Sequence, residues 1–198
     1  PEVILKGRTE LSEDEKQRLG LPVFVKPARG GSSIGVSKVS TWEEFPAAVA
    51  LALEDDEKIL VEPEIVGQEV EIGVLHYADG TLLASVPALL AGIDDSDEGF
   101  YGFDTKYLDN VVTAEIPAPF APELTEKLRD MAIRSFEALN CEGLSRVDFF
   151  VTEDSVYINE INTLPGFTPI SMYPQVLAAS GVEYPALLEA LIEQALAK

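Results

Sequence analysis

The chain has 198 residues, of which 46% are hydrophobic and 25% are charged, a balance typical of a folded globular protein rather than a disordered one. The formal net charge of −21 would repel phosphate backbones and anionic lipid headgroups, which argues against binding to nucleic acid or to a membrane. One cysteine, no apolar run near the about 20 residues of a membrane span, and no signal-peptide layout together predict a cytoplasmic protein.

The first third of the chain predicts two short helices around a hairpin. A capping box followed by a glycine stop predicts a helix within Ser12–Gly20. Pro22–Val25 and Val36–Val39 are apolar and β-branched, which predicts two strands joined by a long glycine-rich tip. A second capping box at Thr41–Glu44 predicts a helix that starts there and runs to about Leu53.

The rest of the chain alternates strand and helix patterns. Strands are predicted over Lys58–Glu62, Glu69–Leu75, Leu83–Leu89, Leu144–Val151 and Val156–Asn162, and helices over Pro122–Leu139 and Pro185–Ala197. The last helix is expected to be amphipathic through Leu188, Leu191, Ile192 and Leu196. Between Ala91 and Asp104 the pattern predicts a loop with aromatic anchors. Hairpins that cluster apart from helices indicate an α+β fold built on antiparallel sheets.

The glycine-rich tip, Gly30–Gly35, is the first candidate site. It has the two glycines of a Walker loop, but Val36 follows where that loop requires lysine. Lys26 at the end of the preceding strand, together with the backbone amides and serine hydroxyls of the tip, could close over a polyphosphate. The alternative is an ordinary hairpin tip with a solvated lysine, because glycine-rich tips are frequent.

The last strand pair is the second candidate. Residues two apart share a strand face, so Arg146 lies on the side of Asp148, and Glu160 on the side of Asn162. A turn centred on Asp154 places Asp148 opposite Glu160, and a divalent cation would relieve their repulsion. Hard oxygen ligands favour Mg²⁺. The alternative is a register that differs by one residue, which would send the two carboxylates to opposite faces.

Four blocks of sequence together resemble the D-alanine–D-alanine ligase family of the ATP-grasp superfamily. They are Val25-Lys26-Pro27 with Arg29 to Gly35, Phe100-Tyr101 through Lys106-Tyr107-Leu108, Arg146-Val147-Asp148, and Asn159 to Thr168. The resemblance spans nearly the whole chain. It implies an ATP-grasp fold of two α+β lobes, which we expect at 1–62 (central lobe) and 63–198 (C-terminal lobe). The amino-terminal domain of the family is expected to be absent.

The resemblance also implies roles for individual residues. Lys26 and Lys106 would contact phosphates together with Gly31 and Ser33 of the glycine-rich tip, Glu62 and the backbone near Ile65 would meet the adenine, and Glu69 would bind the ribose. Asp148, Glu160 and Asn162 would hold two Mg²⁺ ions, with Mn²⁺ as an alternative. Arg146 and the Gly166 amide would stabilise an oxyanion, Ser171 and the Met172 amide would hold a substrate carboxylate, and Ser32 and Tyr107 would order the loops. These are expectations from the family.

The expected reaction joins two D-alanines at the expense of ATP through an acyl phosphate, for peptidoglycan precursor synthesis. The full-length enzyme is expected to be a homodimer. Two alternatives remain open. One is a related ATP-grasp ligase that makes D-alanine–D-lactate, and the other is an ATP-binding fragment without turnover, because the missing domain supplies part of the first amino-acid site.

Overall fold

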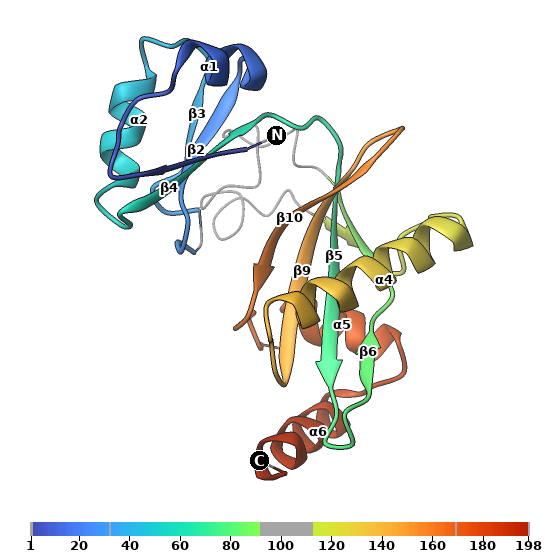
Figure 1. Ribbon diagram of the computed structural model, residues 1–198. Helices are drawn as coiled ribbons and strands as arrows, with labels where there is room; N and C mark the ends of the chain where they lie inside the picture. The colour runs from blue at the N-terminus through green and yellow to red at the C-terminus, as the bar shows by residue number, and fades with distance from the viewer. Residues whose placement is uncertain (1, 32, 92–112, 169, 198) are drawn as a thin grey trace. The chain divides into compact units, whose positions relative to one another are not determined.

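The computed structural model describes residues 2–31, 33–91, 113–168 and 170–197. The described chain forms two compact units, which meet in sequence at Ile65 and Val66 (Figure 1). Each unit has its own antiparallel sheet and its own apolar core. The two ATP-grasp lobes expected at 1–62 and 63–198 remain a prediction. The division into compact units does not show that each unit forms one half of a nucleotide-binding site.

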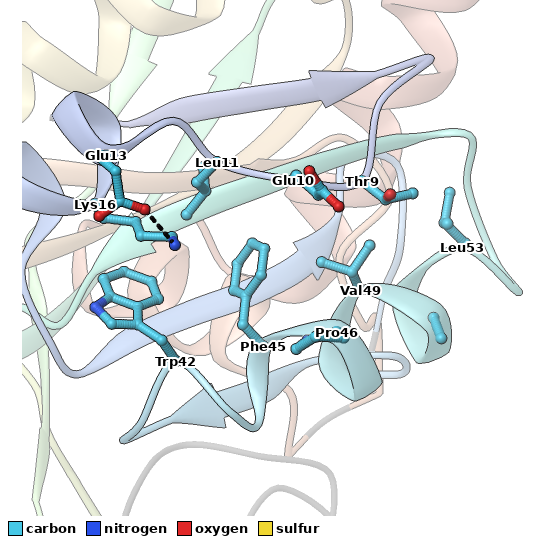
Figure 2. Close-up of a pocket in the computed structure, with 11 residues that line it drawn as sticks. Thr9, Glu10, Leu11, Glu13, Lys16, Trp42, Phe45, Pro46, Val49 and Leu53 are labelled. Atoms are coloured by element: carbon cyan, nitrogen blue, oxygen red, sulfur yellow. Dashed lines mark hydrogen bonds and ion pairs between the residues drawn. The ribbon is translucent and has the colours of Figure 1, made fainter.

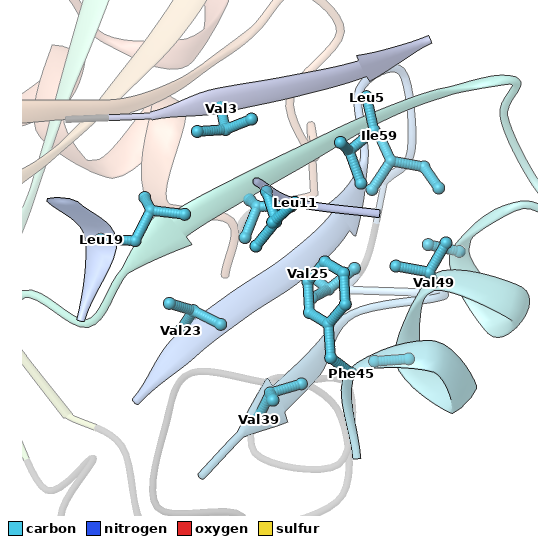
Figure 3. Packing of buried hydrophobic residues seen from close by; sticks show 13 residues of the cluster. Val3, Leu5, Leu11, Leu19, Val23, Val25, Val39, Phe45, Val49 and Ile59 are labelled. Atoms are coloured by element: carbon cyan, nitrogen blue, oxygen red, sulfur yellow. The ribbon is translucent and has the colours of Figure 1, made fainter. Parts of the chain in front are cut away.

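The described residues of the first unit form a four-stranded sheet with two helices. Its elements are β1 (Val3–Lys6), α1 (Glu13–Leu19), β2 (Val23–Pro27), β3 (Ser37–Val39), α2 (Phe45–Ala52) and β4 (Lys58–Pro63), and the strand order is β1-β4-β2-β3. Alternate residues of the strands, such as Val23 and Val25, point into one apolar cluster with Leu19 of α1 and Phe45 and Val49 of α2 (Figure 3). The two helices therefore share one core with the sheet, and the other face of β2 carries the partly buried Phe24 and Lys26.

The two helices of this unit begin differently. At α1 the predicted capping box is confirmed, because Ser12 Oγ accepts the Glu15 amide and the Glu15 carboxylate accepts the Ser12 amide. The prediction for α2 is wrong in its start: the helix begins at Phe45, after turns over residues 41–44. Pro46 stands in the first helical turn, where its missing N–H costs nothing, so it opens the helix instead of bending it.

The second unit is built on a larger antiparallel sheet. Its elements are β5 (Gln68–His76), β6 (Leu82–Ala84), β7 (Ala88–Ala91), β8 (Thr113–Glu115), α4 (Pro122–Ala138), β9 (Leu144–Val151), β10 (Val156–Asn162), α5 (Met172–Ala179) and α6 (Tyr184–Leu196). The strand order is β10-β9-β5-β7-β8, with β6 also paired to β5. Among the described residues, no helix is both long and apolar enough to cross a membrane.

The two faces of this sheet are covered differently. Val70, Ile72 and Val74 of β5 point to the α4 face and pack with Leu128 and Phe136 of that helix. The other face is covered by α5 and α6 only toward the end of β5, where Leu75 joins their apolar cluster (Figure 1). The remainder of that second face carries polar residues of β5, β9 and β10, which places the candidate site there.

A glycine permits the close approach of α5 to β5. A Cβ built on Gly73 would lie 2.4 Å from Leu177 Cδ2 and 3.1 Å from Tyr173 Cδ2, so the two elements could not pack this closely around a larger residue. The Tyr173 hydroxyl donates a hydrogen bond to the Val74 carbonyl at 3.0 Å, and burial raises the pKa of this phenol. This contact fixes α5 against β5.

Two sequence predictions need correction in this unit. The strand expected over Leu83–Leu89 is two strands, β6 and β7, because Pro87 has no amide to donate and the Ser85 hydroxyl accepts the Gly73 amide at 2.9 Å. In α6 the buried residues are Leu187, Ala190 and Gln194, whereas Leu188, Ile192 and Leu196 of the predicted face are exposed. The helix has two apolar stripes. The stripe that contains Leu187 and Ala190, and not the predicted one, packs against α5 and Leu75 of β5.

Candidate functional site

The polar face of the second unit begins with the β9–β10 hairpin. Arg146 donates two hydrogen bonds to Asp148, from Nε to Oδ1 and from Nη2 to Oδ2, each of 2.7 Å. Both side chains come from alternate positions of one strand, as predicted. On the neighbouring strand Glu160 lies directly opposite Asp148, and Asn162 lies opposite Arg146. The predicted pairing of the two carboxylates is therefore confirmed.

A third carboxylate joins this face from β5. Glu71 pairs with Asp148 across β5 and β9, so the register aligns Glu71, Asp148 and Glu160 in a row over three adjacent strands. The Glu71 side chain is 3% exposed, and its Oε2 lies 3.3 Å from Nε of Arg146 in an ion pair. Sequence reasoning missed Glu71, although its spacing of two residues from Glu69 was a signal that both share a strand face.

Arg146 is the positive charge that faces the three carboxylates of this row. Burial lowers the pKa of the Arg146 guanidinium, but the hydrogen bonds and charge of Asp148 and the charges of Glu71 and Glu160 outweigh that effect and raise it. Three carboxylates and one guanidinium sum to a formal charge of −2. Arg146 therefore offsets part of the repulsion between Asp148 and Glu160, so the opposed pair does not by itself require a metal ion.

The donor chemistry of the face nevertheless fits Mg²⁺. Asp148, Glu160 and Asn162 offer only carboxylate and amide oxygens, and Mg²⁺ in proteins commonly takes one or two carboxylates, with water and phosphate completing its shell. Asn162 Oδ1 accepts the Leu164 amide at 3.3 Å. Within the described ranges, no group of three His, Cys, Asp or Glu side chains could by itself hold a metal ion.

Beyond β10, the chain makes a compact turn before α5. Ser171 Oγ accepts the Thr168 amide at 3.0 Å and lies 2.9 Å from Thr168 Oγ1. A Cβ on Gly166 would lie 2.9 Å from the same Ser171 oxygen, so only glycine leaves that hydroxyl in place. Met172 is the first residue of α5, and its amide belongs to the first turn of the helix, whose N–H groups have no partner within the helix.

In the first unit, the predicted residues Lys26 and Glu62 lie side by side. They project from β2 and β4 on the face away from the apolar core, and Lys26 Nζ is 2.6 Å from Glu62 Oε2. Ile65, half-buried, follows the end of β4. Glu69 belongs to the second unit, at the start of β5. The predicted site residues are therefore distributed over two units, each of which brings its own subset together.

The glycine-rich tip lies between β2 and β3, as the hairpin prediction required. The Ile34 amide donates to the Gly31 carbonyl at 3.1 Å, and Ser33 has a positive φ of 57°. Gly31 has open space around the position of a Cβ. Three predicted residues, Ser32, Lys106 and Tyr107, and almost all of the predicted aromatic loop lie outside the described residues. Their roles stay predictions.

A groove in the first unit is lined by none of the predicted site residues that the structure describes. It has a volume of about 540 Å³ and lies between α1 and α2 (Figure 2). Its lining includes Trp42, Phe45 and Val49, with Lys16 Nζ 5.9 Å from the Trp42 ring centroid. Lys16 also pairs with Glu13 at 2.8 Å. The lining is mainly apolar and carries no cluster of acidic or nucleophilic groups aimed at a ligand.

Comparison with known proteins places these features in a family. Residues 2–193 match the family described as D-ala D-ala ligase C-terminus. A D-alanine–D-alanine ligase of Corynebacterium efficiens is 66% identical over 195 residues, which cover 98% of this chain and 54% of that protein. The chain thus spans about half the length of the curated relatives it matches.

Solved structures agree. The D-alanine–D-alanine ligase from Coxiella burnetii superposes with a TM-score of 0.81 at 36% identity, over 99% of this chain and 51% of that one. The ligase from Bacillus anthracis complexed with ATP gives a TM-score of 0.78 at 26% identity, over 99% and 60%. These matches confirm the predicted α+β fold of the ATP-grasp type.

Proposed function

Because the chain belongs to the D-ala D-ala ligase C-terminus family, we propose that the protein containing it joins two D-alanines into D-alanyl-D-alanine at the expense of ATP. The product serves peptidoglycan precursor synthesis. The single observation that carries this proposal is the polar face on which Arg146 donates two hydrogen bonds to Asp148, opposite Glu160. This face combines a guanidinium that can stabilise an oxyanion with carboxylate oxygens that can bind Mg²⁺.

The proposed reaction has two covalent steps. The carboxylate of the first D-alanine attacks the γ-phosphorus of ATP, which releases ADP and leaves an acyl phosphate. The amine of the second D-alanine then attacks the acyl carbon, an oxyanion forms in the tetrahedral intermediate, and its collapse expels inorganic phosphate. One proton leaves the amine as the amide forms. The sum is two D-alanines and ATP converted to dipeptide, ADP and phosphate.

The roles proposed for residues of the second unit are those that the family resemblance implies, and the charges of these residues are compatible with them. Arg146, with its guanidinium fixed by two carboxylates, and the Gly166 amide stabilise the oxyanion, a contribution that is usually the largest in such catalysis. Ser171 and the Met172 amide hold the carboxylate of the second D-alanine. Asp148, Glu160 and Asn162 hold Mg²⁺, which supplies positive charge against the phosphate oxygens when it is bound.

The remaining roles concern the nucleotide. Lys26 binds phosphate together with the amides at Gly31 and Ser33, while Glu62 and the backbone of Ile65 meet the adenine. Glu69 accepts the ribose hydroxyls. Phosphate must then compete with Glu62 for the Lys26 ammonium, which lies 2.6 Å from that carboxylate. We further propose that Ser32, Lys106 and Tyr107 complete the set, that the longer protein is a cytoplasmic homodimer, and that it binds neither nucleic acid nor membrane.

One alternative has an observation in its favour. The chain spans about half the length of its curated relatives, so it could bind ATP without turning it over. The test is phosphate release from Mg²⁺-ATP by this chain, with D-alanine, with D-alanine plus D-lactate, and with no amino acid, alongside a calorimetric titration of the nucleotide. D-alanine-dependent release supports ligation. Release that rises only with D-lactate supports the lactate ligase, and binding without release supports the fragment.

A further inference from the structure

The base of the glycine-rich tip is held by a carboxylate from outside it. Asp56 lies in the turn between α2 and β4, and its side chain is 3% exposed. Its Oδ2 accepts hydrogen bonds from the amide and Nε of Arg29, both at 3.0 Å. Its Oδ1 accepts Nη2 of Arg29 at 2.7 Å and the Lys58 amide at 3.0 Å. Both carboxylate oxygens are thus fully used.

These four bonds join the two strands that carry the Lys26–Glu62 pair. Arg29 lies two residues after the end of β2, and Lys58 begins β4. The Ala28 amide donates to the Lys58 carbonyl at 2.9 Å, which continues the connection between the strands past the end of β2. The exit of the tip is close as well, because a Cβ on Gly35 would lie 2.7 Å from Asp55 Oδ2. The α2–β4 turn therefore contacts the tip at its entry and at its exit.

The arrangement also decides between two readings of Arg29. A cation next to two glycines would ordinarily be assigned to a phosphate group. The Arg29 side chain is 71% exposed, yet its Nε and Nη2 face the buried Asp56 rather than the space over the tip. Its charge is thus engaged by a carboxylate in a turn that contains four consecutive acidic residues, Glu54 to Glu57.

We infer that Asp56 is a positioning residue for the nucleotide site: with Arg29 as its clamp, it fixes the entry of the glycine-rich tip beside Lys26, and Arg29 is not itself a phosphate ligand. This inference rests on the proposed function, because it assumes that the tip and Lys26 receive the phosphates of ATP. Its distinctive consequence is that Asp56 and Arg29 act as one unit.

The experiment is a double-mutant cycle on Mg²⁺-ATP affinity, measured by calorimetry on this chain. The variants are Asp56→Asn, Arg29→Lys and the double variant. Glu57→Gln is the matched control, since it removes one charge from the same turn but is 69% exposed and pairs with Lys6. Each single change is expected to weaken binding about tenfold and the double change no further, because coupled residues are not additive. The control should stay within about twofold.

Each outcome discriminates. If Arg29 binds phosphate directly, Asp56→Asn leaves affinity unchanged or raised and the two changes add, which overturns the inference. Should Asp56→Asn fail to fold, Asp56→Glu takes its place in the cycle, because it keeps the charge but displaces the carboxylate: losses that do not add with Arg29→Lys support the clamp, and unchanged affinity in Asp56→Glu or additive losses overturn it. Wild-type chain that binds no nucleotide overturns the proposed function together with the inference, whereas wild-type binding with unaffected variants overturns the inference alone.

Discussion

Asp148 and Glu160 stand directly opposite each other because β10 contains a register shift. The hairpin turn pairs Val151 with Val156, and a regular continuation would place Asp148 opposite Asn159. The shift between Ile158 and Glu160 adds one residue to β10, which brings Glu160 to Asp148 and keeps it on the polar face. Without the extra residue, a regular register would pair Glu160 with Val147 on the apolar face against α4.

Replacing Glu160 by Gln separates metal binding from stability. In metal-free buffer the free energy of unfolding is expected to stay constant or rise by up to about 1 kcal/mol, because one of two opposed carboxylates is removed. Affinity for Mg²⁺-ATP should fall at least about tenfold. Urea denaturation and calorimetry measure the two effects, with the exposed turn residue Glu153→Gln as control. A loss of stability beyond that of the control would show that Glu160 is structural.

Glu71→Gln tests the buried member of the carboxylate row. The change leaves Arg146 with Asp148 but removes a charge that is 3% exposed, so the free energy of unfolding should fall by about 2 kcal/mol. Urea denaturation measures it. The exposed ion pair of Glu126 with Arg129, at 2.8 Å, provides the matched change Glu126→Gln, which should cost less than about 0.5 kcal/mol. Equal effects in both variants would contradict a special role for the buried pair.

Lys26→Ala should weaken Mg²⁺-ATP binding about tenfold or more, because a charge-assisted contact to phosphate is lost. Lys38 offers a close control: it lies on the adjacent strand β3 and pairs with Glu64 at 2.6 Å, the same separation as Lys26 and Glu62. Lys38→Ala should leave the affinity within about twofold. Calorimetric titration of both variants decides, and equal losses would indicate only a general effect of surface charge.

Acid should weaken the cap of α1. The Arg8 guanidinium and the Ser12 amide bond the Glu15 carboxylate and lower its pKa from 4.5 to about 2. A carboxylate whose pKa is lower in the folded state stabilises the fold above its unfolded pKa, and that contribution disappears as the pH falls from 4.5 to about 2. The difference in melting temperature between wild type and Glu15→Gln should therefore shrink over this range. A constant difference would rule out the linkage.

Gly73→Ala tests how closely α5 packs against β5. The added methyl would lie 2.4 Å from Leu177 Cδ2, so the Leu177 side chain or the helix must shift, and the expected loss of stability is about 1–3 kcal/mol. The double variant with Leu177→Ala should lose less than the sum of the two single changes, because the truncation makes room for the methyl. Urea denaturation of the three variants measures the coupling, and strict additivity would contradict the proposed contact.

Much of the candidate site could be predicted from local sequence. The short β9–β10 hairpin predicted that Asp148 and Glu160 face each other, although a register shift in β10, which the sequence did not indicate, sets this pairing. The period of two residues places Arg146 beside Asp148. The capping box of α1 is likewise a relation between Ser12 and Glu15 only three residues apart. Such features follow from backbone geometry and side chains that are close in sequence.

Tertiary structure alone decided the rest. Glu71 becomes a buried partner of Arg146 only because β5 pairs with β9, strands more than 60 residues apart, and no local pattern encodes that register. The buried stripe of α6 was chosen between two apolar stripes by packing against α5 and β5. Asp56 likewise reaches Arg29 from 27 residues away. The hydrophobic effect is non-directional, so it does not by itself decide which of two apolar faces of a helix is buried. That choice, and the pairing of charges that are distant in sequence, depend on the whole fold.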